Sequence, residues 1–167
     1  MAVLEIKKFN EPVLRKRCRK VREINKEIKQ LIVNMAQTME KNQGVGLAAS
    51  QVGVLKNIIV VKGDFKGQRI LALVNPKIIK KSKEKEKNIE GCLSFPGIFL
   101  EIKRAKEIEI KGLDINGEKI KLTTKGLLAR IFQHEIDHLD GILFFDRLSF
   151  FGRIRFTLLN AAKRQFR

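Results

Sequence analysis

The sequence predicts an α+β fold, in which antiparallel or mixed sheets pack around a central helix and further helices lie near both ends of the chain. Segments with alternating apolar residues occur in blocks, and hairpin signals join them, which is unlike the regular strand–helix alternation of a doubly wound sheet. The chain has 167 residues, of which 44% are hydrophobic. This length and composition suit one globular domain spanning residues 1–167.

The first helix is predicted at residues 24–41. Its apolar residues recur at helical spacing and form one stripe: Ile24, Ile28, Leu31, Ile32, Met35 and Met39. Asn25 can cap the helix, and Gly44 marks its end. The glycine-rich stretch GVGLAASQ (44–51) follows, and residues 57–63 then predict a strand.

The middle of the chain is dominated by strand patterns. Residues 69–79 predict a strand that Pro76 stops or bends. The charged run KKSKEKEK (80–87) predicts a solvated loop or the tip of a hairpin. Residues 106–124 alternate around Asn116-Gly117, which is a strong signal for a hairpin turn.

Two more helices complete the prediction. The second runs from about Lys125 to Leu139, with Thr123 or Thr124 as candidate N-caps and Asp140-Gly141 at its end. Residues 151–165 read as a basic amphipathic helix at the C-terminus.

The charge balance favours a polyanionic partner. The net charge is +17, so nucleic acid or a ribosome surface would attract the protein; a surface that is simply rich in lysine explains the charge equally well. Two cysteines argue against a secreted disulfide framework. No apolar run is long enough to span a membrane, and the N-terminus is too highly charged for a signal peptide. We therefore expect a cytoplasmic protein.

Both histidines of the chain lie in the stretch FQHEIDHLDG (132–141). Residues four apart share one face of a helix, so His134 and His138 can bind the same metal ion. Glu135 follows the first histidine, and in an HExxH pattern this acid acts as a general base rather than as a ligand. The alternative is a surface helix that contains two histidines and an acid by chance.

A catalytic site of this kind needs a third protein ligand. No histidine or glutamate follows the pattern, and Asp140 and Asp146 are the only acids downstream. Cys92, in NIEGCLSFPG, is the upstream candidate, because a thiolate is a strong ligand for a borderline metal. The alternative is a small buried cysteine without a chemical role. We favour such an inert role for Cys18.

Three stretches in this order, GVGLAASQ, EGCLS and QHEIDHL, resemble the peptide deformylase family, in its compact bacterial type. The matching residues are Gly44, Gly46, Leu47, Ala48, Ala49 and Gln51; Glu90, Gly91, Cys92, Leu93 and Ser94; and Gln133, His134, Glu135, Asp137 and His138. The resemblance covers nearly the whole chain up to the C-terminal helix.

The resemblance implies a metal-dependent hydrolase that removes the formyl group from the N-terminal formylmethionine of nascent polypeptides. It assigns Cys92, His134 and His138 to one divalent metal ion, most often Fe²⁺ in this family, with Zn²⁺ or Ni²⁺ as alternatives. Glu90 or Asp137 would orient these ligands, unless they only form salt bridges.

The same resemblance assigns the remaining steps. Glu135 would act as acid and base, Gln51 and the backbone N–H of Leu93 would form the oxyanion hole, and Gly46 would bind the substrate backbone. We expect a monomer whose basic C-terminal helix contacts the ribosome near the emerging chain.

The methionine pocket is predicted from apolar residues alone. Val45, Ile131 and Leu127 are its candidates, although Leu127 fits an ordinary core slightly better. We expect Arg130 to face solvent or the substrate backbone. Two other functions stay open: a small metalloprotease with Asp146 as third ligand, and a basic RNA- or ribosome-binding protein with a structural metal.

Overall fold

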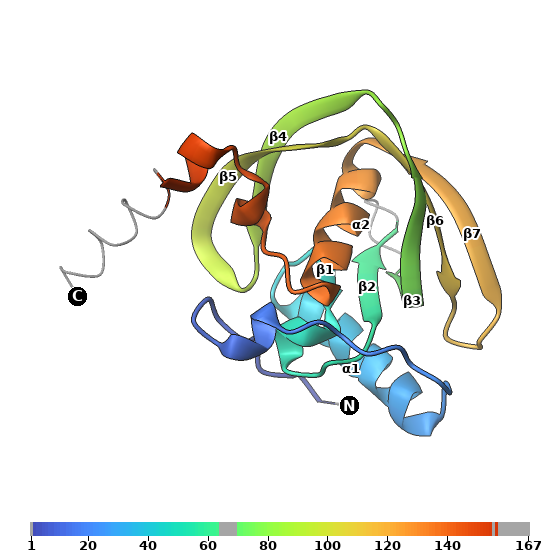
Figure 1. The fold of residues 1–167 in the computed structure, drawn as a ribbon. Coiled ribbons are helices and arrows are strands. Elements are labelled where there is room, and N and C mark those ends of the chain that lie inside the picture. The colour runs from blue at the N-terminus through green and yellow to red at the C-terminus, as the bar shows by residue number, and fades with distance from the viewer. Residues whose placement is uncertain (1, 64–69, 155, 157–167) are drawn as a thin grey trace.

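The computed structural model describes residues 2–63, 70–154 and 156, and it confirms the predicted α+β fold (Figure 1). The strands are β1 (Gly46–Ala48), β2 (Ile58–Lys62), β3 (Ile70–Lys81), β4 (Lys85–Cys92), β5 (Phe95–Ala105), β6 (Glu107–Leu113) and β7 (Lys119–Lys125). The helices are α1 (Lys26–Lys41) and α2 (Gly126–Leu139), with 3₁₀ turns η1 (Pro12–Arg15), η2 (Ala49–Val52) and η3 (Phe144–Arg147).

The strands form two antiparallel sheets. One sheet has five strands in the order β1-β2-β3-β6-β7, and the other is the β4–β5 pair. Helix α2 contacts strands of both sheets and lies at the centre of the molecule (Figure 1). No helix among the described residues has the length and apolar content that crossing a membrane requires.

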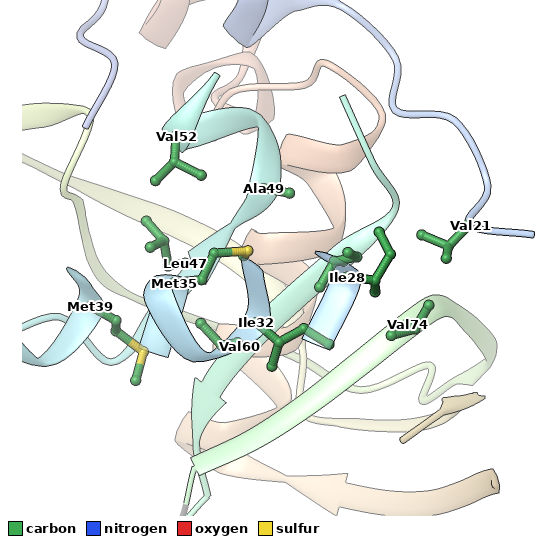
Figure 2. Close-up of a cluster of buried hydrophobic side chains, with 11 residues drawn as sticks. Val21, Ile28, Ile32, Met35, Met39, Leu47, Ala49, Val52, Val60 and Val74 are labelled. Atoms are coloured by element: carbon green, nitrogen blue, oxygen red, sulfur yellow. The ribbon is translucent and has the colours of Figure 1, made fainter. Parts of the chain in front are cut away.

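Helix α1 covers one face of the five-stranded sheet. Its N-terminus is capped by Asn25, whose Oδ1 accepts the Ile28 N–H at 3.0 Å, as predicted. Figure 2 shows the apolar stripe of α1 packed against side chains from β1, β2 and β3. After the helix it is Gln43, not the glycine that follows it, that adopts the left-handed conformation, with φ 55°. The left-handed residue that follows α1 therefore lies one position before Gly44, the residue predicted to mark the end of the helix.

The other face of the same sheet packs against α2. Along β2, Ile58 and Val60 belong to the cluster with α1, whereas Ile59 and Val61 belong to the cluster with α2. Successive strand residues point to opposite faces, so a continuous apolar run is what a strand buried on both sides requires. This double burial places α2 firmly beneath the sheet.

Strand β3 bends at Pro76 and continues beyond it. Asn75 has a φ of 53°, and the register with β6 shifts between Val74 and Lys77, across the proline, and again after Ile78. The Asn75 side chain accepts the N–H of Val21 and donates to its carbonyl, both at 2.9 Å. The bend is therefore anchored to the N-terminal segment.

Two local predictions are wrong. The charged run at 80–87 is a loop only at residues 82–84, because its ends belong to β3 and β4, and it is no hairpin tip, because these strands pair with β6 and β5 respectively. Thr123 and Thr124 lie in β7 and do not cap α2; Lys125 occupies the cap position and makes no side-chain cap bond. Both errors arise because the connections are shorter than the patterns indicate: three residues join β3 to β4, and β7 passes directly into α2.

The remaining boundaries agree with the sequence. The β6–β7 turn has Gly117 at φ 88°, and α2 ends at Leu139, with Asp140 as its C-cap before Gly141 at φ 73°. Residues 150–154 and 156 are helical, and the rest of the predicted C-terminal helix lies outside the described residues.

Candidate active site

Three potential metal ligands converge between α2 and the end of β4. His134 and His138 are one helical turn apart and buried, and Cys92 is the last residue of β4. The Cys92 sulfur lies 3.2 Å from His138 Nε2, and one ligand atom of each residue lies within 4.8 Å of the others. A tetrahedral ion with bonds of about 2.0–2.3 Å needs donors separated by about 3.5 Å. The three side chains therefore fit a divalent ion.

The orientation of His134 is set by Glu90. Its Nδ1 lies 3.0 Å from Glu90 Oε2, and because an ionised carboxylate can only accept, Nδ1 is the donor and Nε2 is the nitrogen left to bind a metal ion. Burial alone would raise the pKa of Glu90, but hydrogen bonds from His134 and Arg104 lower it to about 2. The geometry thus supports the orienting role predicted for Glu90.

Burial opposes positive charge on both imidazoles, but their pKa values shift in opposite directions. It lowers the pKa of His138 well below the ordinary value, so this ring is neutral. Burial also opposes charge on His134, but hydrogen bonds with Cys92 and Glu90 raise its pKa well above the ordinary value. The groups that raise the pKa of His134 would equally favour a metal ion in place of the added proton.

Glu135 is buried beside this cluster. Burial raises the pKa of its carboxyl to about 7, and Oε2 has no hydrogen-bond partner among the described residues. The backbone of Gly46 lies directly against it, since a Cβ on that glycine would come within 2.4 Å of Glu135 Oε1. A buried carboxyl with a pKa near neutrality and a free oxygen can both accept and donate a proton.

The Gln51 amide is held in one orientation. Its Oε1 accepts the Ala48 N–H at 2.8 Å, which turns Nε2 toward the Cys92 sulfur at 3.4 Å and the Ser94 hydroxyl at 3.2 Å. Leu93 lies between Cys92 and Ser94 in the tight β4–β5 turn and lines the same cavity. The site thus presents a preorganised amide donor beside the metal ligands.

A cavity of about 570 Å³ opens onto His134 and Glu135. Val45 and Gly46, which are predicted to contact the substrate, line it. Ile131, in contrast, is buried in the core beneath the sheet, and Leu127 is 53% exposed and does not line the cavity. The predicted pocket roles of these two residues therefore have no support from the geometry.

The apolar wall of the cavity was missed by the sequence reasoning. It is formed by residues that follow Cys92: Leu93, Phe95, Pro96, Ile98 and Phe99. The sequence offered one signal for this wall, which is that these residues closely follow Cys92, a candidate metal ligand.

Other candidate residues lie apart from the ligands. Asp146 binds Arg15 and accepts the Leu143 N–H, and it is not part of the cluster, so the metalloprotease interpretation loses its third ligand. Burial raises the pKa of the Cys18 thiol to about 11, which agrees with its predicted inert role. The expectation that Arg130 faces solvent or substrate is wrong: only 4% of it is exposed.

Comparisons with known proteins agree with this geometry. Residues 3–153 match the family model described as Polypeptide deformylase. A peptide deformylase of Thermodesulfovibrio yellowstonii is 48% identical over 151 residues, which cover 89% of this chain and 91% of that protein. One of Carboxydothermus hydrogenoformans is 49% identical over 147 residues, covering 88% and 94%.

Solved structures give the same result. Peptide deformylase from Thermus thermophilus superposes with a TM-score of 0.90 at 40% identity, covering 96% of this chain and 94% of that one. The Ehrlichia chaffeensis enzyme in complex with actinonin superposes with a TM-score of 0.87 at 40% identity, covering 98% of both chains.

Proposed function

The chain belongs to the polypeptide deformylase family, and from this premise we propose how it removes the formyl group from the N-terminal formylmethionine of nascent polypeptides. One observation carries the proposal: Cys92, His134 and His138 converge beside the buried carboxyl of Glu135, at the base of an open cavity. Hydrolysis of a formamide needs an activated water and an acid for the departing amine, and these groups can supply both.

Cys92, His134 and His138 hold one divalent ion. Thiolate and imidazole donors suit borderline metals, which include Fe²⁺, Zn²⁺ and Ni²⁺. Fe²⁺ is the proposed ion because the family resemblance implies it, with Zn²⁺ and Ni²⁺ as alternatives. When bound, such an ion supplies Lewis acidity, which lowers the pKa of water and polarises a carbonyl oxygen. One thiolate and two neutral imidazoles leave a net charge of +1 at the site.

Glu135 moves the proton. It accepts a proton from the water that attacks the formyl carbon and later gives it to the amine nitrogen, so that formate and a free N-terminus are the products. Its burial and its pKa of about 7 support this role, because a carboxyl titrating near neutrality can serve in both directions.

The oxyanion of the tetrahedral intermediate is stabilised by two donors, the Gln51 amide and the backbone N–H of Leu93. The fixed orientation of Gln51 supports its role, since a donor that is already aimed needs no reorganisation during the reaction. Gly46 binds the substrate backbone, and Val45 contacts the methionine side chain; both line the cavity.

The test compares Glu135→Gln with wild type, both purified anaerobically and analysed for metal. Formate release from a formyl-Met peptide should fall about 10³-fold in the variant, while the metal content stays at one ion per chain. Glu27→Gln, on the exposed side of α1, is the control and should retain wild-type turnover. Near-wild-type turnover of Glu135→Gln would show that another group moves the proton.

The enzyme acts as a cytoplasmic monomer beside the ribosome, where its substrate emerges. The net charge of +17 and the basic C-terminal segment support the ribosome contact. Deleting residues 152–167 should abolish pelleting with ribosomes at low salt without changing turnover of a short peptide. Unchanged pelleting would refute the contact, and light scattering tests the monomer.

A further inference from the structure

Arg130 is a buried cation to which the proposed reaction gives no role. It lies on α2 one turn before His134 and is 4% exposed. Its Nη1 donates to Glu90 Oε1 and to the carbonyl of Ile102, both at 2.8 Å, and its Nη2 donates to the carbonyl of Glu86 at 3.0 Å. Its Nε–H is also buried and has no partner among the described residues. Burying a guanidinium with an unpaired donor carries a desolvation cost, so stabilising the fold is a weak explanation for Arg130.

The Glu90 carboxylate is held by four donors, two on each oxygen. Oε1 accepts from Arg104 Nε at 2.9 Å and from Arg130 Nη1 at 2.8 Å. Oε2 accepts from Arg104 Nη2 at 3.0 Å and lies 3.0 Å from His134 Nδ1. Arg130 and His134 stand one turn apart on the same helix, so the carboxylate spans that turn and contacts both. Its rotation is therefore fixed.

The proposed metal ligands come from two separate elements, Cys92 from β4 and the histidines from α2. Arg130 lies on α2 and binds the backbone of β4 at Glu86 and of β5 at Ile102. It thus connects the helix that carries the histidines to the hairpin that carries the cysteine. We propose that Arg130 is a positioning residue: it fixes Glu90, and through Glu90 the His134 ring, in the arrangement that binds the metal.

A purely structural tie between α2 and β5 already exists elsewhere. The Gln133 amide donates to the carbonyl of Ala105 at 3.0 Å and accepts its N–H at 3.2 Å. Arg104 of β5 makes a further tie, because it binds Asp137 on α2 and both oxygens of Glu90. Arg130 therefore shares the holding of Glu90 with Arg104. The tie through Arg130 differs from the Gln133 tie because it reaches Glu90 directly. Its specific consequence should therefore appear in metal binding and not only in folding.

The test measures Zn²⁺ affinity of the metal-free full-length chain by competition with a chromophoric chelator. The inference rests on the proposed metal site, and loss of a group that orients a ligand typically weakens metal binding about 10- to 100-fold. Arg130→Met should therefore raise the Zn²⁺ dissociation constant at least about tenfold, and Arg130→Lys should recover part of the loss. The visible spectrum of the Co²⁺-loaded protein should change in Arg130→Met, because the ligand geometry is disturbed.

Arg147→Met is the matched control. Arg147, the last residue of η3, binds the carboxylate of Asp137 on α2 but does not contact Glu90, so its loss should leave the Zn²⁺ dissociation constant within about twofold of wild type. Urea unfolding of the metal-free proteins should show lower stability in both variants. Lower stability alone is the result expected of a purely structural residue. A loss of Zn²⁺ affinity in Arg130→Met but not in Arg147→Met is the result expected of a positioning residue.

The inference is overturned if Arg130→Met binds Zn²⁺ within twofold of wild type, or if Arg147→Met loses as much affinity. Should Arg130→Met fail to fold, Arg130→Gln decides by the same criteria. A wild-type chain that binds no Zn²⁺ through Cys92 would instead refute the proposed metal site, and the two failures are thereby distinguishable.

Discussion

Replacing Gly46 with alanine should disable the enzyme through Glu135 while the fold persists. Gly46 is the first residue of β1, and its Cα faces the buried carboxyl group. A Cβ built there lies 2.4 Å from Oε1, 2.8 Å from Cδ and 2.9 Å from Cγ of Glu135, whereas ordinary contacts begin at 3.4 Å. The carboxylate must therefore move by about 1 Å, because β1 is anchored by its pairing with β2.

The size of the effect follows from that displacement. Misplacing a catalytic group by about 1 Å can cost about 10²-fold in rate, which corresponds to about 2.7 kcal/mol at 1.36 kcal/mol per tenfold. Overpacking a buried site also costs about 1–3 kcal/mol of stability. We therefore expect the kcat for formate release to fall about 100-fold, in a protein that is still folded and metal-loaded.

Gly112→Ala is the matched control. Gly112 lies in β6 of the same sheet, and a Cβ there would meet the Val74 carbonyl at 3.1 Å, away from the cavity. That variant should lose stability but keep its kcat. A double-mutant cycle adds a second check: in a Glu135→Ala background, Gly46→Ala should destabilise the protein less, because the clashing group is gone. If Gly46→Ala keeps kcat within twofold of wild type, the contact does not position Glu135.

Three further outcomes follow from the structure. Gln51→Ala removes an aimed donor, so kcat should fall about 10²- to 10³-fold with a smaller change in KM; a change confined to KM would exclude an oxyanion role. Burial raises the pKa of Cys18 to about 11 from the ordinary 9.0, so the unfolded chain releases this proton first, and the thiol's contribution to stability is lost as pH rises above 9. Urea unfolding between pH 9 and 11 should accordingly show a smaller decline for Cys18→Ala than for wild type, and parallel declines would contradict this. Met35 is fully buried between α1 and the five-stranded sheet, so Met35→Ala should lower the free energy of unfolding by about 2–5 kcal/mol without changing Zn²⁺ stoichiometry. A loss below about 1 kcal/mol would contradict its core position.

The elements that carry a strong local signal were predictable from the sequence. The stripe of α1 and its Asn25 cap depend on residues close in sequence, and so does the turn at Gly117. The pairing of His134 with His138 follows from helical spacing alone. The convergence of Cys92 with them depends on how β4 packs on α2; residue chemistry and elimination made Cys92 a candidate, and the family resemblance gave it a role.

The failures have a common physical origin in tertiary contacts. Arg130 was expected to face solvent or the substrate backbone, although its spacing of four from His134 already placed it on the ligand face. Its burial depends on hydrogen bonds to Glu90 and to the carbonyl groups of Ile102 and Glu86 in the β4–β5 sheet. These contacts are distant in sequence, so no local pattern reveals them. The charged run at 80–87 was misread because strand pairing, and not composition, decides where its ends lie.

X-ray absorption spectroscopy of the Zn²⁺-loaded protein tests the metal site most directly. One sulfur at about 2.3 Å and two imidazole nitrogens at about 2.0–2.1 Å should surround the ion, and the sulfur should disappear in Cys92→Ser. A first shell without sulfur in the wild-type protein, or one unchanged by Cys92→Ser, would contradict the ligand set on which the proposed chemistry depends.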